Sequence, residues 1–240
     1  MKLVFTKNYE DLNIKAFEIM KRVVKNNPYA VLGLATGTTP LGLYCLMIED
    51  HKAHGTSYAH IRTVNLDEYK GLPQNHNQSY AYFMRENLFR HLNIEESNIY
   101  IENGMAADEA AECARYNKLL EEMPRDIQLL GLGSNGHIAF NEPNTPFGSE
   151  THVVDLTENT IKDNARLFAD ISEVPKKAFT MGIKQIMQAK QILILASGKN
   201  KAEAVYNTVC GKITEEVPAS VLQLHPNCIL IADKEAASKL

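Results

Sequence analysis

Apolar residues are arranged along this chain in two alternating patterns. Short continuous apolar runs, such as residues 29–35, are typical of strands buried in a parallel sheet. Between such runs, apolar residues recur every three or four positions, as in residues 8–27, which is the spacing of an amphipathic helix. The same patterns predict strands at residues 61–66, 127–132, 152–156, 179–183, 191–196 and 228–232, and helices at 41–47, 79–92, 107–120 and 218–224.

Strands that alternate with helices predict βαβ units, because a parallel strand can only be reached through a crossover connection. We therefore predict that residues 1–240 form a single α/β domain. Its architecture is expected to be Rossmann-like, with a mostly parallel sheet and helices on both faces. In such sheets, ligands bind in the crevice at the carboxyl ends of the strands.

The apolar run at 127–132 ends in a turn that contains Gly133, Asn135 and Gly136 and leads directly to His137. Histidine is the side chain best suited to move a proton near neutral pH, and Glu142 follows closely enough to orient it. The turn therefore predicts an acid–base centre at a strand end. The alternative is that His137 only caps a loop carbonyl.

Two familiar motifs in this turn lack the context that they need. Gly131-x-Gly133-x-x-Gly136 matches the dinucleotide fingerprint, but that motif requires a helix to open at its last glycine, and Pro143 follows too soon. Ser134 cannot stand at a nucleophile elbow, because Leu132 occupies a position where that motif requires glycine. We expect no nicotinamide or flavin cofactor.

The loop between the strand at 29–35 and the next helix has the composition of an anion site. It contains Thr36, Gly37, Thr38 and Thr39, followed by a proline suited to the first helical position. Thr38 or Thr39 is expected to be the N-cap, with backbone N–H groups and the helix dipole facing a phosphate. The loop lacks the lysine of a nucleotide P-loop, which favours a phosphomonoester over a triphosphate. The alternative is an ordinary capped helix.

Three further segments are expected near the same crevice. Asp67 follows the strand at 61–66, although an aspartate there could instead cap the turn at 67–69. Lys201 ends a small-residue turn after the strand at 191–196, and its charge suits an anionic group. Residues 157–168 are polar and predict a mobile segment over the site.

The composition excludes several classes of partner. Lys and Arg number 25 against 29 Asp and Glu, and without a basic block we expect no nucleic-acid partner. No apolar run approaches the ~18 residues of a membrane span, and the first residues turn polar too soon for a signal peptide. The four cysteines form no disulfide-like pattern, so a cytoplasmic location is expected. His51 and His54 share a helix face but lack a third ligand, so no metal is expected.

Four segments together resemble the glucosamine-6-phosphate deaminase family, within a wider group that includes 6-phosphogluconolactonases and ribose-5-phosphate isomerases. The second and third segments are specific to the deaminases, and the resemblance covers nearly the whole chain. The segments are LATGTTP at 34–40, NLDEY at 65–69, GSNGHIAFNEP at 133–143 and PASVLQLH at 218–225.

This resemblance implies an enzyme that combines aldose–ketose isomerisation with hydrolytic deamination, in amino-sugar catabolism. Glucosamine 6-phosphate would become fructose 6-phosphate and ammonia, without a metal or organic cofactor. Asp67 would take the C2 proton, and His137 would open the sugar ring with Glu142 as its partner. The loop at 36–39, Arg166 and Lys201 would hold the phosphate.

Two departures from the family pattern change these expectations. Asn135 stands where some members have aspartate; its amide can orient His137 by a hydrogen bond but cannot supply a negative charge. Longer members carry further C-terminal residues involved in hexamer formation and allosteric activation. The resemblance therefore leaves open whether this chain is a monomer or a homo-oligomer.

Two other functions fit parts of the same pattern. A 6-phosphogluconolactonase-type hydrolase would use His137 and the phosphate loop but needs no carboxylate facing C2, so Asp67 discriminates between the two activities. A non-catalytic sugar-phosphate sensor would normally carry a DNA-binding helical domain, for which we find neither a segment nor a basic face.

Overall fold

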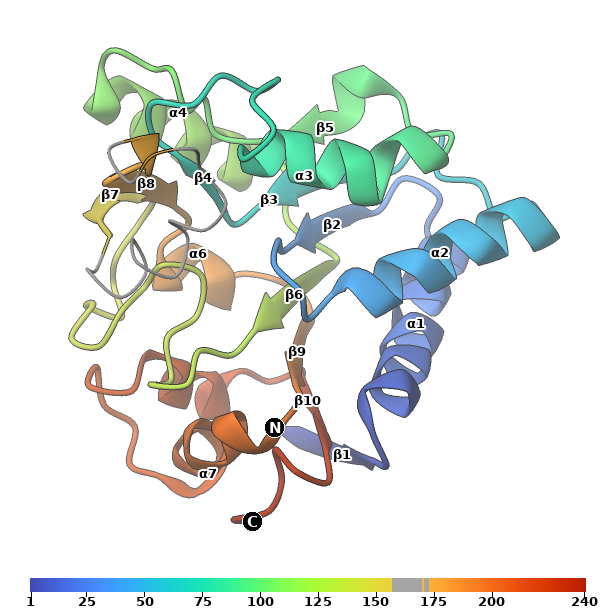
Figure 1. The fold of residues 1–240 in the computed structure, drawn as a ribbon, viewed down its shortest axis with the longest axis vertical. Helices are drawn as coiled ribbons and strands as arrows, with labels where there is room; N and C mark the ends of the chain where they lie inside the picture. Colours follow the sequence, from blue (N-terminus) through green and yellow to red (C-terminus); the bar gives the residue numbers. More distant parts are fainter. Residues whose placement is uncertain (157–169, 171–172) are drawn as a thin grey trace.

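A large parallel sheet forms the centre of the molecule, as the computed structural model shows for residues 1–156, 170 and 173–240. In this described part of the chain, seven strands pair in the order β1-β10-β9-β6-β2-β3-β5, and every pairing is parallel (Figure 1). The strands are β1 (Lys2–Thr6), β2 (Val31–Leu34), β3 (Arg62–Asn65), β5 (Ile99–Tyr100), β6 (Ile127–Gly131), β9 (Ile192–Ala196) and β10 (Cys228–Asp233).

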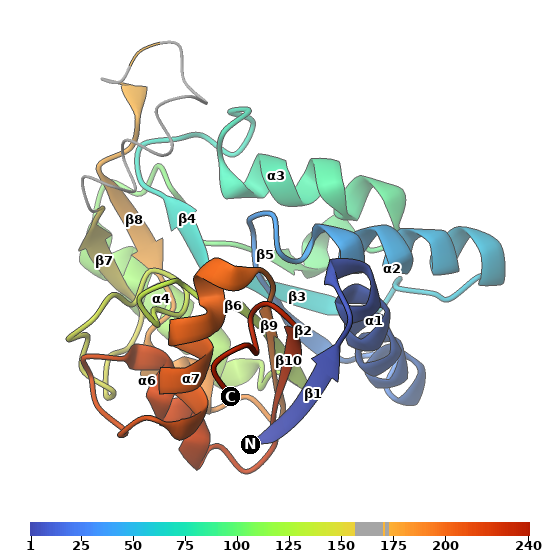
Figure 2. The same ribbon diagram turned by 60° about the horizontal axis from the view of Figure 1, so that its bottom comes forward.

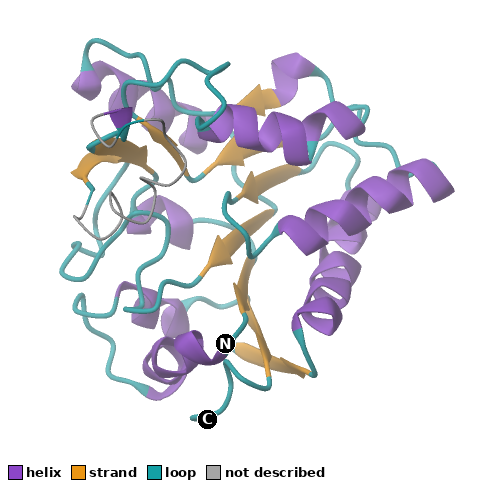
Figure 3. Cartoon of the chain, in the orientation of Figure 1, coloured by secondary structure: helices purple, strands orange, loops and turns teal. Residues whose placement is uncertain are grey.

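Helices cover both faces of this sheet, as expected (Figures 2 and 3). On one side lie α1 (Tyr9–Asn26) and α2 (Leu41–His54), and on the other lie α6 (Ile183–Met187) and α7 (Ala202–Cys210). None of the described helices is long and apolar enough to cross a membrane. The remaining helices are α3 (Tyr80–Asn87), α4 (Glu109–Glu122) and the 3-10 helices η1 (Phe89–His91), η2 (Glu96–Asn98), η4 (Lys199–Lys201) and η5 (Pro218–Leu224).

Helix α1 begins and ends where its sequence requires. The Asn8 side chain caps it by accepting a hydrogen bond from the Asp11 N–H at 2.9 Å, and the acidic first turn suits the positive end of the helix dipole. The helix stops at Asn26, close before Pro28, since a residue that precedes proline disfavours helical backbone. Its buried face recurs at helical spacing: Leu12, Asn13, Ala16, Met20 and Val24.

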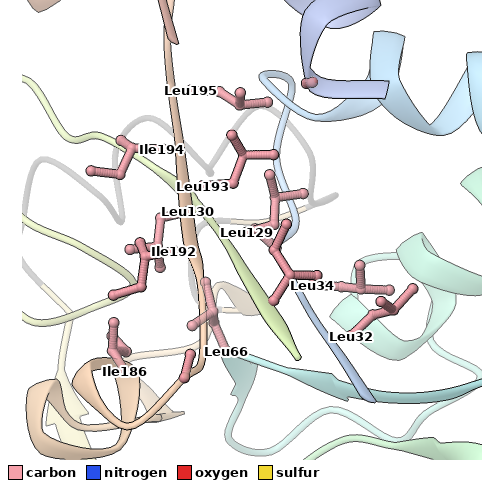
Figure 4. Packing of buried hydrophobic residues seen from close by; sticks show 14 of the residues in the cluster. Leu32, Leu34, Leu66, Leu129, Leu130, Ile186, Ile192, Leu193, Ile194 and Leu195 are labelled. Atoms are coloured by element: carbon pink, nitrogen blue, oxygen red, sulfur yellow. The ribbon is translucent and has the colours of Figure 1, made fainter. Parts of the chain in front are cut away.

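The core lies on both sides of the central strands. Ile192 and Ile194 point to one side of β9, and Leu193 and Leu195 to the other, where they meet side chains of β2 and β6 (Figure 4). All four residues are at most 1% exposed. A strand covered on both faces needs apolar side chains at every position, which explains the continuous apolar runs in the sequence.

A second, antiparallel sheet lies beside the large one and was not anticipated. Its strands are β4 (Asp67–Tyr69), β8 (Lys177–Thr180) and β7 (His152–Asp155), in the order β4-β8-β7. Residues 67–69 pair with β8 as a strand, so the alternative of a turn at these residues does not apply. The strand expected at 179–183 also ends early, because α6 begins at Ile183. Strands β1 and β5 were missed, and the segment expected over the site, 157–168, lies outside the described residues.

Candidate active site

A cavity of about 290 Å³ lies where the large sheet meets the small one. Loops that follow β2, β6 and β9 contribute to its wall, and so does β4. Its polar lining residues are Thr36, Gly37, Thr39, Asp67, Tyr80, Gly133, Ser134, His137 and Lys201. The crevice at the carboxyl ends of the parallel strands is thus where the predicted groups meet.

A larger hollow, of about 400 Å³, lies beside α3 and β5 and contains none of the predicted site residues. Its two arginines are already paired, Arg85 with Glu96 and Arg115 with Glu112. Their charges are therefore compensated within the protein. We take the smaller cavity as the site, because it collects uncompensated polar groups of several kinds.

The loop between β2 and α2 presents an open helix end to the cavity. Gly37 has φ +90°, a left-handed conformation that favours glycine. Pro40, rather than Thr38 or Thr39, is the N-cap residue, so the expected threonine cap is wrong. Pro40 makes no side-chain cap hydrogen bond, and no acidic residue lies in the first turn of α2, so the positive helix end carries no compensating charge and is available to an anion. Thr39 lines the cavity, whereas Thr38 does not.

Tyr9 of α1 braces this loop from behind. Its hydroxyl oxygen lies 2.9 Å from the carbonyl oxygen of Thr38 and 3.0 Å from that of Thr39. The same hydroxyl accepts a hydrogen bond from the N–H of Gly42 at 3.1 Å. Loop and helix start are therefore held in one conformation before any ligand arrives, which reduces the entropy cost of binding.

Lys201 reaches the same cavity from the far side. It ends η4 and lines the wall together with Thr36 and Thr39. Burial holds its pKa below the usual value, and within the described part of the chain no carboxylate pairs with it. Such a cation is suited to an anionic ligand. Arg166, also expected at the phosphate, lies outside the described residues, so its placement stays a prediction.

His137 is fixed by close packing in the turn after β6. A Cβ atom on Gly133 would lie 2.4 Å from Nδ1 of the imidazole, so only glycine leaves room for the ring. The His137 N–H donates to Oδ1 of Asn135 at 3.1 Å, and Nδ2 of Asn135 donates to Oε2 of Glu142 at 2.8 Å. Asn135 therefore links the backbone of His137 to the carboxylate of Glu142, and it makes no hydrogen bond to the imidazole ring, which it was expected to orient.

Glu142 lies behind the imidazole, away from the cavity lining. Its Oε1 is 3.3 Å from Nδ1 of His137, close enough for electrostatic attraction although not aligned as a hydrogen bond. The contact with His137 is the main reason that the pKa of Glu142 lies below its usual value, and Asn135 adds to it while burial opposes it. The expected pair is present, and it leaves Nε2 of His137 free of this contact.

Asp67 is the most buried of the predicted catalytic groups, with 7% of its surface exposed. It lines the cavity from β4, and burial, assisted by the charge of Glu68, raises its pKa to about 8. A carboxylate with such a raised pKa is a stronger base than an ordinary aspartate. Strand pairing with Thr180 fixes its backbone, so the alternative of a simple turn cap does not apply.

Comparison with known proteins agrees with this arrangement. A family model described as glucosamine-6-phosphate isomerases/6-phosphogluconolactonase matches residues 8–230. The chain belongs to this family. A glucosamine-6-phosphate deaminase of Thermoanaerobacter pseudethanolicus is 52% identical over 239 residues, covering 99% of this chain and 94% of the relative. One of Clostridium novyi is 51% identical over 241 residues and covers both chains completely.

Solved structures extend the likeness to three dimensions. A monomeric glucosamine-6-phosphate deaminase is 48% identical, with a TM-score of 0.96 over 100% of both chains. A 6-phosphogluconolactonase from Trypanosoma brucei superposes with a TM-score of 0.80 over 100% of this chain and 98% of the other. At 19% identity, that second likeness shows the fold alone. The resemblance inferred from the four sequence segments is confirmed, and so is the fold class.

Aromatic residues of the site were missed by the sequence analysis. Tyr80 and Phe140 line the cavity with parallel rings, 6.2 Å apart at 7°, and Tyr69 packs against Tyr80 at 4.5 Å. In the sequence these residues appear only as apolar positions of a helix, a turn and a strand end. These rings form an apolar wall beside Asp67, and such a wall favours a raised carboxyl pKa.

Among the described residues, the site lacks the side-chain cluster of a metal site and the helix end of a dinucleotide site. Within the described ranges, no group of three His, Cys, Asp or Glu side chains could hold a metal ion. No helix opens at Gly136, so the glycines of this turn lack the helix end that a pyrophosphate needs. The arrangement instead suits proton transfer on an anionic small molecule, because an uncompensated helix end, a cation and two acid–base groups line one cavity.

Proposed function

We propose that this chain converts glucosamine 6-phosphate and water into fructose 6-phosphate and ammonia. The observation that carries the proposal is the position of Asp67, a buried base in the same cavity as an anion-binding helix end and Lys201. Relatives at 48–52% identity over the full chain are glucosamine-6-phosphate deaminases, which supports the same substrate.

The first step opens the sugar ring. His137 takes the proton of the C1 hydroxyl and delivers a proton to the ring oxygen, which leaves an aldehyde at C1. The carboxylate of Glu142 beside Nδ1 stabilises the imidazolium that forms in between. Ring opening matters because C2 becomes acidic only when it lies next to a carbonyl group.

Isomerisation and deamination follow. Asp67 removes the proton from C2 while a proton passes from the substrate's ammonium group to the oxygen on C1, which gives an amino-enol. Asp67 then delivers a proton to C1, which leaves an iminium group at C2. Water adds to C2 and ammonia leaves, so one water molecule is consumed in a hydrolytic last step. The phosphate is remote from these carbons, and its binding energy holds C1 and C2 against the carboxylate.

The test is release of ammonia from glucosamine 6-phosphate by the purified protein, in deuterated water. Transfer by Asp67 should leave deuterium at C1 of fructose 6-phosphate on one face only, because a single carboxylate delivers it. Asp67→Asn keeps the shape but removes the base, so turnover should fall about 10²–10⁴-fold. Asp155→Asn is the matched control, since Asp155 is an exposed residue of the same small sheet.

A folded Asp67→Asn protein that keeps most of its turnover would refute this assignment of the base. Hydrolysis of 6-phosphogluconolactone, with no release of ammonia from the amino sugar, would make the lactonase the better description.

We further propose a cytoplasmic location, because Cys45, Cys113, Cys210 and Cys228 are all free thiols, as in proteins of reducing compartments.

A further inference from the structure

A second carboxylate lies directly beside the base. Glu68 is 1% exposed and accepts three hydrogen bonds from backbone N–H groups. Its Oε1 receives the N–H of Tyr69 at 2.7 Å and that of Tyr80 at 2.9 Å, and its Oε2 receives the N–H of Ala81 at 2.8 Å. Both oxygens of a buried carboxylate are thus satisfied by the main chain, which suits the ionised form.

Two of these donors belong to the first turn of α3. Tyr80 and Ala81 are its first residues, and their N–H groups have no partner within the helix. Ser79 caps the helix separately, by accepting the N–H of Tyr82 at 3.0 Å. The helix dipole adds to the attraction, so Glu68 fastens the start of α3 to β4.

This connection bears on the geometry of the cavity. Successive residues of a strand point to opposite faces, so Asp67 can face the cavity while Glu68 faces α3. Tyr80, at the fastened end of α3, lines the cavity and stacks on Phe140. A Cβ atom on Gly104 would lie 3.4 Å from Cγ of Glu68, so the main chain at Gly104 packs closely against the Glu68 side chain.

We propose that Glu68 is a positioning residue for Asp67: its carboxylate fastens the wall that carries Tyr80 and keeps a fixed negative charge beside the base. The inference rests on the proposed function, because it concerns how Asp67 works as that base. No contact between Glu68 and substrate is implied. The role is to hold Asp67 in place and to make it more basic.

The groups that face Glu68 agree with this role. Asp67 and Tyr69 adjoin it on β4, Tyr80 faces it from α3, and Glu102 approaches after β5. Burial raises the pKa of Glu68 to about 7 against its three hydrogen bonds, whereas that of Asp67 is about 8. The three backbone N–H donors favour the negative charge of Glu68, and that charge in turn raises the pKa of Asp67.

Glu102 provides a matched control. It is 0% exposed, and within the described residues neither of its carboxyl oxygens has a hydrogen-bond partner. Burial raises its pKa well above the usual value, and the charges of Asp67, Glu68 and Glu112 raise it further. Burial and these neighbouring charges favour the protonated, neutral form of Glu102, and glutamine is a neutral replacement of similar shape.

The experiment compares the pH dependence of kcat/KM for ammonia release in the full-length wild type, Glu68→Gln and Glu102→Gln. The acid limb of this profile reports the base of the free enzyme. In Glu68→Gln it should move to lower pH by about one unit, because a neighbouring negative charge is lost. The plateau kcat should fall about 100-fold as the cavity wall loosens. Glu102→Gln should leave the acid limb where it is in the wild type.

Glu68→Asp separates charge from geometry. It keeps the negative charge but withdraws it from α3, so its acid limb should stay near that of the wild type while kcat falls. Glu68→Asp also tests the positioning role of Glu68 if Glu68→Gln fails to fold. An unmoved acid limb in folded Glu68→Gln, or a wild-type kcat in Glu68→Asp, would overturn the inference. A wild type that releases no ammonia would instead count against the proposed function.

Discussion

The large sheet and the small sheet contribute different kinds of group to the site. Loops at the ends of large-sheet strands carry the threonine loop, His137 and Lys201, whereas β4 of the small sheet carries Asp67. The His137 side chain is 34% exposed, but Asp67 is only 7% exposed. The groups to which we assign substrate binding and ring opening thus lie within reach of water, and the proposed base is withdrawn from it.

The difference has a physical reason. Removing a proton from carbon needs a strong base, and a carboxylate gains basicity when its charge is poorly hydrated. A loop at a strand end could not exclude water as well as a strand packed under aromatic rings. The small sheet thus gives Asp67 a raised pKa, at about 8, at a cost in folding free energy that the apolar large sheet does not bear.

The largest effect should come from His137, the partly exposed proton carrier that follows a strand of the large sheet. His137→Gln keeps hydrogen bonding but cannot carry a proton, so turnover of the cyclic sugar should fall about 10²–10⁴-fold. An analogue held in the open-chain form should lose much less, because it bypasses the step assigned to His137. The measurement is the ratio of the two losses.

His60→Gln is the control for this variant, since His60 is exposed and stacks on Tyr29 away from the cavity. Equal losses on cyclic and open-chain substrates would mean that His137 does not act in ring opening. In that case the assignment of ring opening to the large sheet, and of proton abstraction from carbon to the small sheet, would be wrong in its first part.

The two sheets also differ in how far the sequence predicts them. The β2, β6 and β9 segments are continuous apolar runs followed by glycine-rich turns, and both features are local. The short strand β4 contains Asp67 and Glu68, residues with low strand propensity, and its partner β8 lies far along the chain. Only the tertiary pairing makes it a strand, so the sequence suggested a turn.

The same reasoning applies to the site. Thr36, Asp67, His137 and Lys201 could be predicted to share a cavity, because each follows a strand end and parallel strand ends meet. The hydrogen bonds that Glu68 accepts from α3 could not be predicted, since they depend on where the first turn of α3 lies. The N-cap at Pro40 was missed because the start of a helix can be predicted from sequence only to within one or two residues.

A smaller effect is expected at the phosphate end of the large sheet. Lys201→Ala removes a half-buried cation that has no carboxylate partner in the described chain, so KM should rise about 10–100-fold, the value of one or two charged hydrogen bonds. The fall in kcat should be smaller. Lys199→Ala, an exposed lysine of the same η4 turn, should change neither constant.

Inhibition by inorganic phosphate checks the same placement without turnover. The inhibition constant should rise in Lys201→Ala and stay unchanged in Lys199→Ala. Unaltered KM and unaltered phosphate inhibition in a folded Lys201→Ala protein would remove Lys201 from the anion site. The large sheet would then bind the substrate through the threonine loop without this cation.

The last expected effect concerns stability rather than turnover, and it tests the cost of a buried carboxyl group whose charge acts on Asp67 and Glu68. Burial raises the pKa of Glu102 above its ordinary value of 4.5, so between the ordinary and the raised value the folded protein holds this proton while the unfolded chain loses it. The unfolded state then binds fewer protons, so the free energy of unfolding falls by about 1.4 kcal/mol per pH unit from this group alone. The loss begins near the ordinary glutamate pKa and ends at the raised value in the folded protein.

Glu102→Gln cannot ionise in either state and should lack this part of the slope. Urea unfolding measured from about pH 3.5 to pH 8 should therefore show the stability of the variant rising relative to that of the wild type above pH about 4.5, with parallel trends below it. Asp67 and Glu68 contribute similar slopes to both proteins, so the difference between the two curves isolates Glu102. Parallel curves over this range would mean that Glu102 is ionised in the folded protein, and its negative charge would then have to be counted with that of Glu68 beside the base.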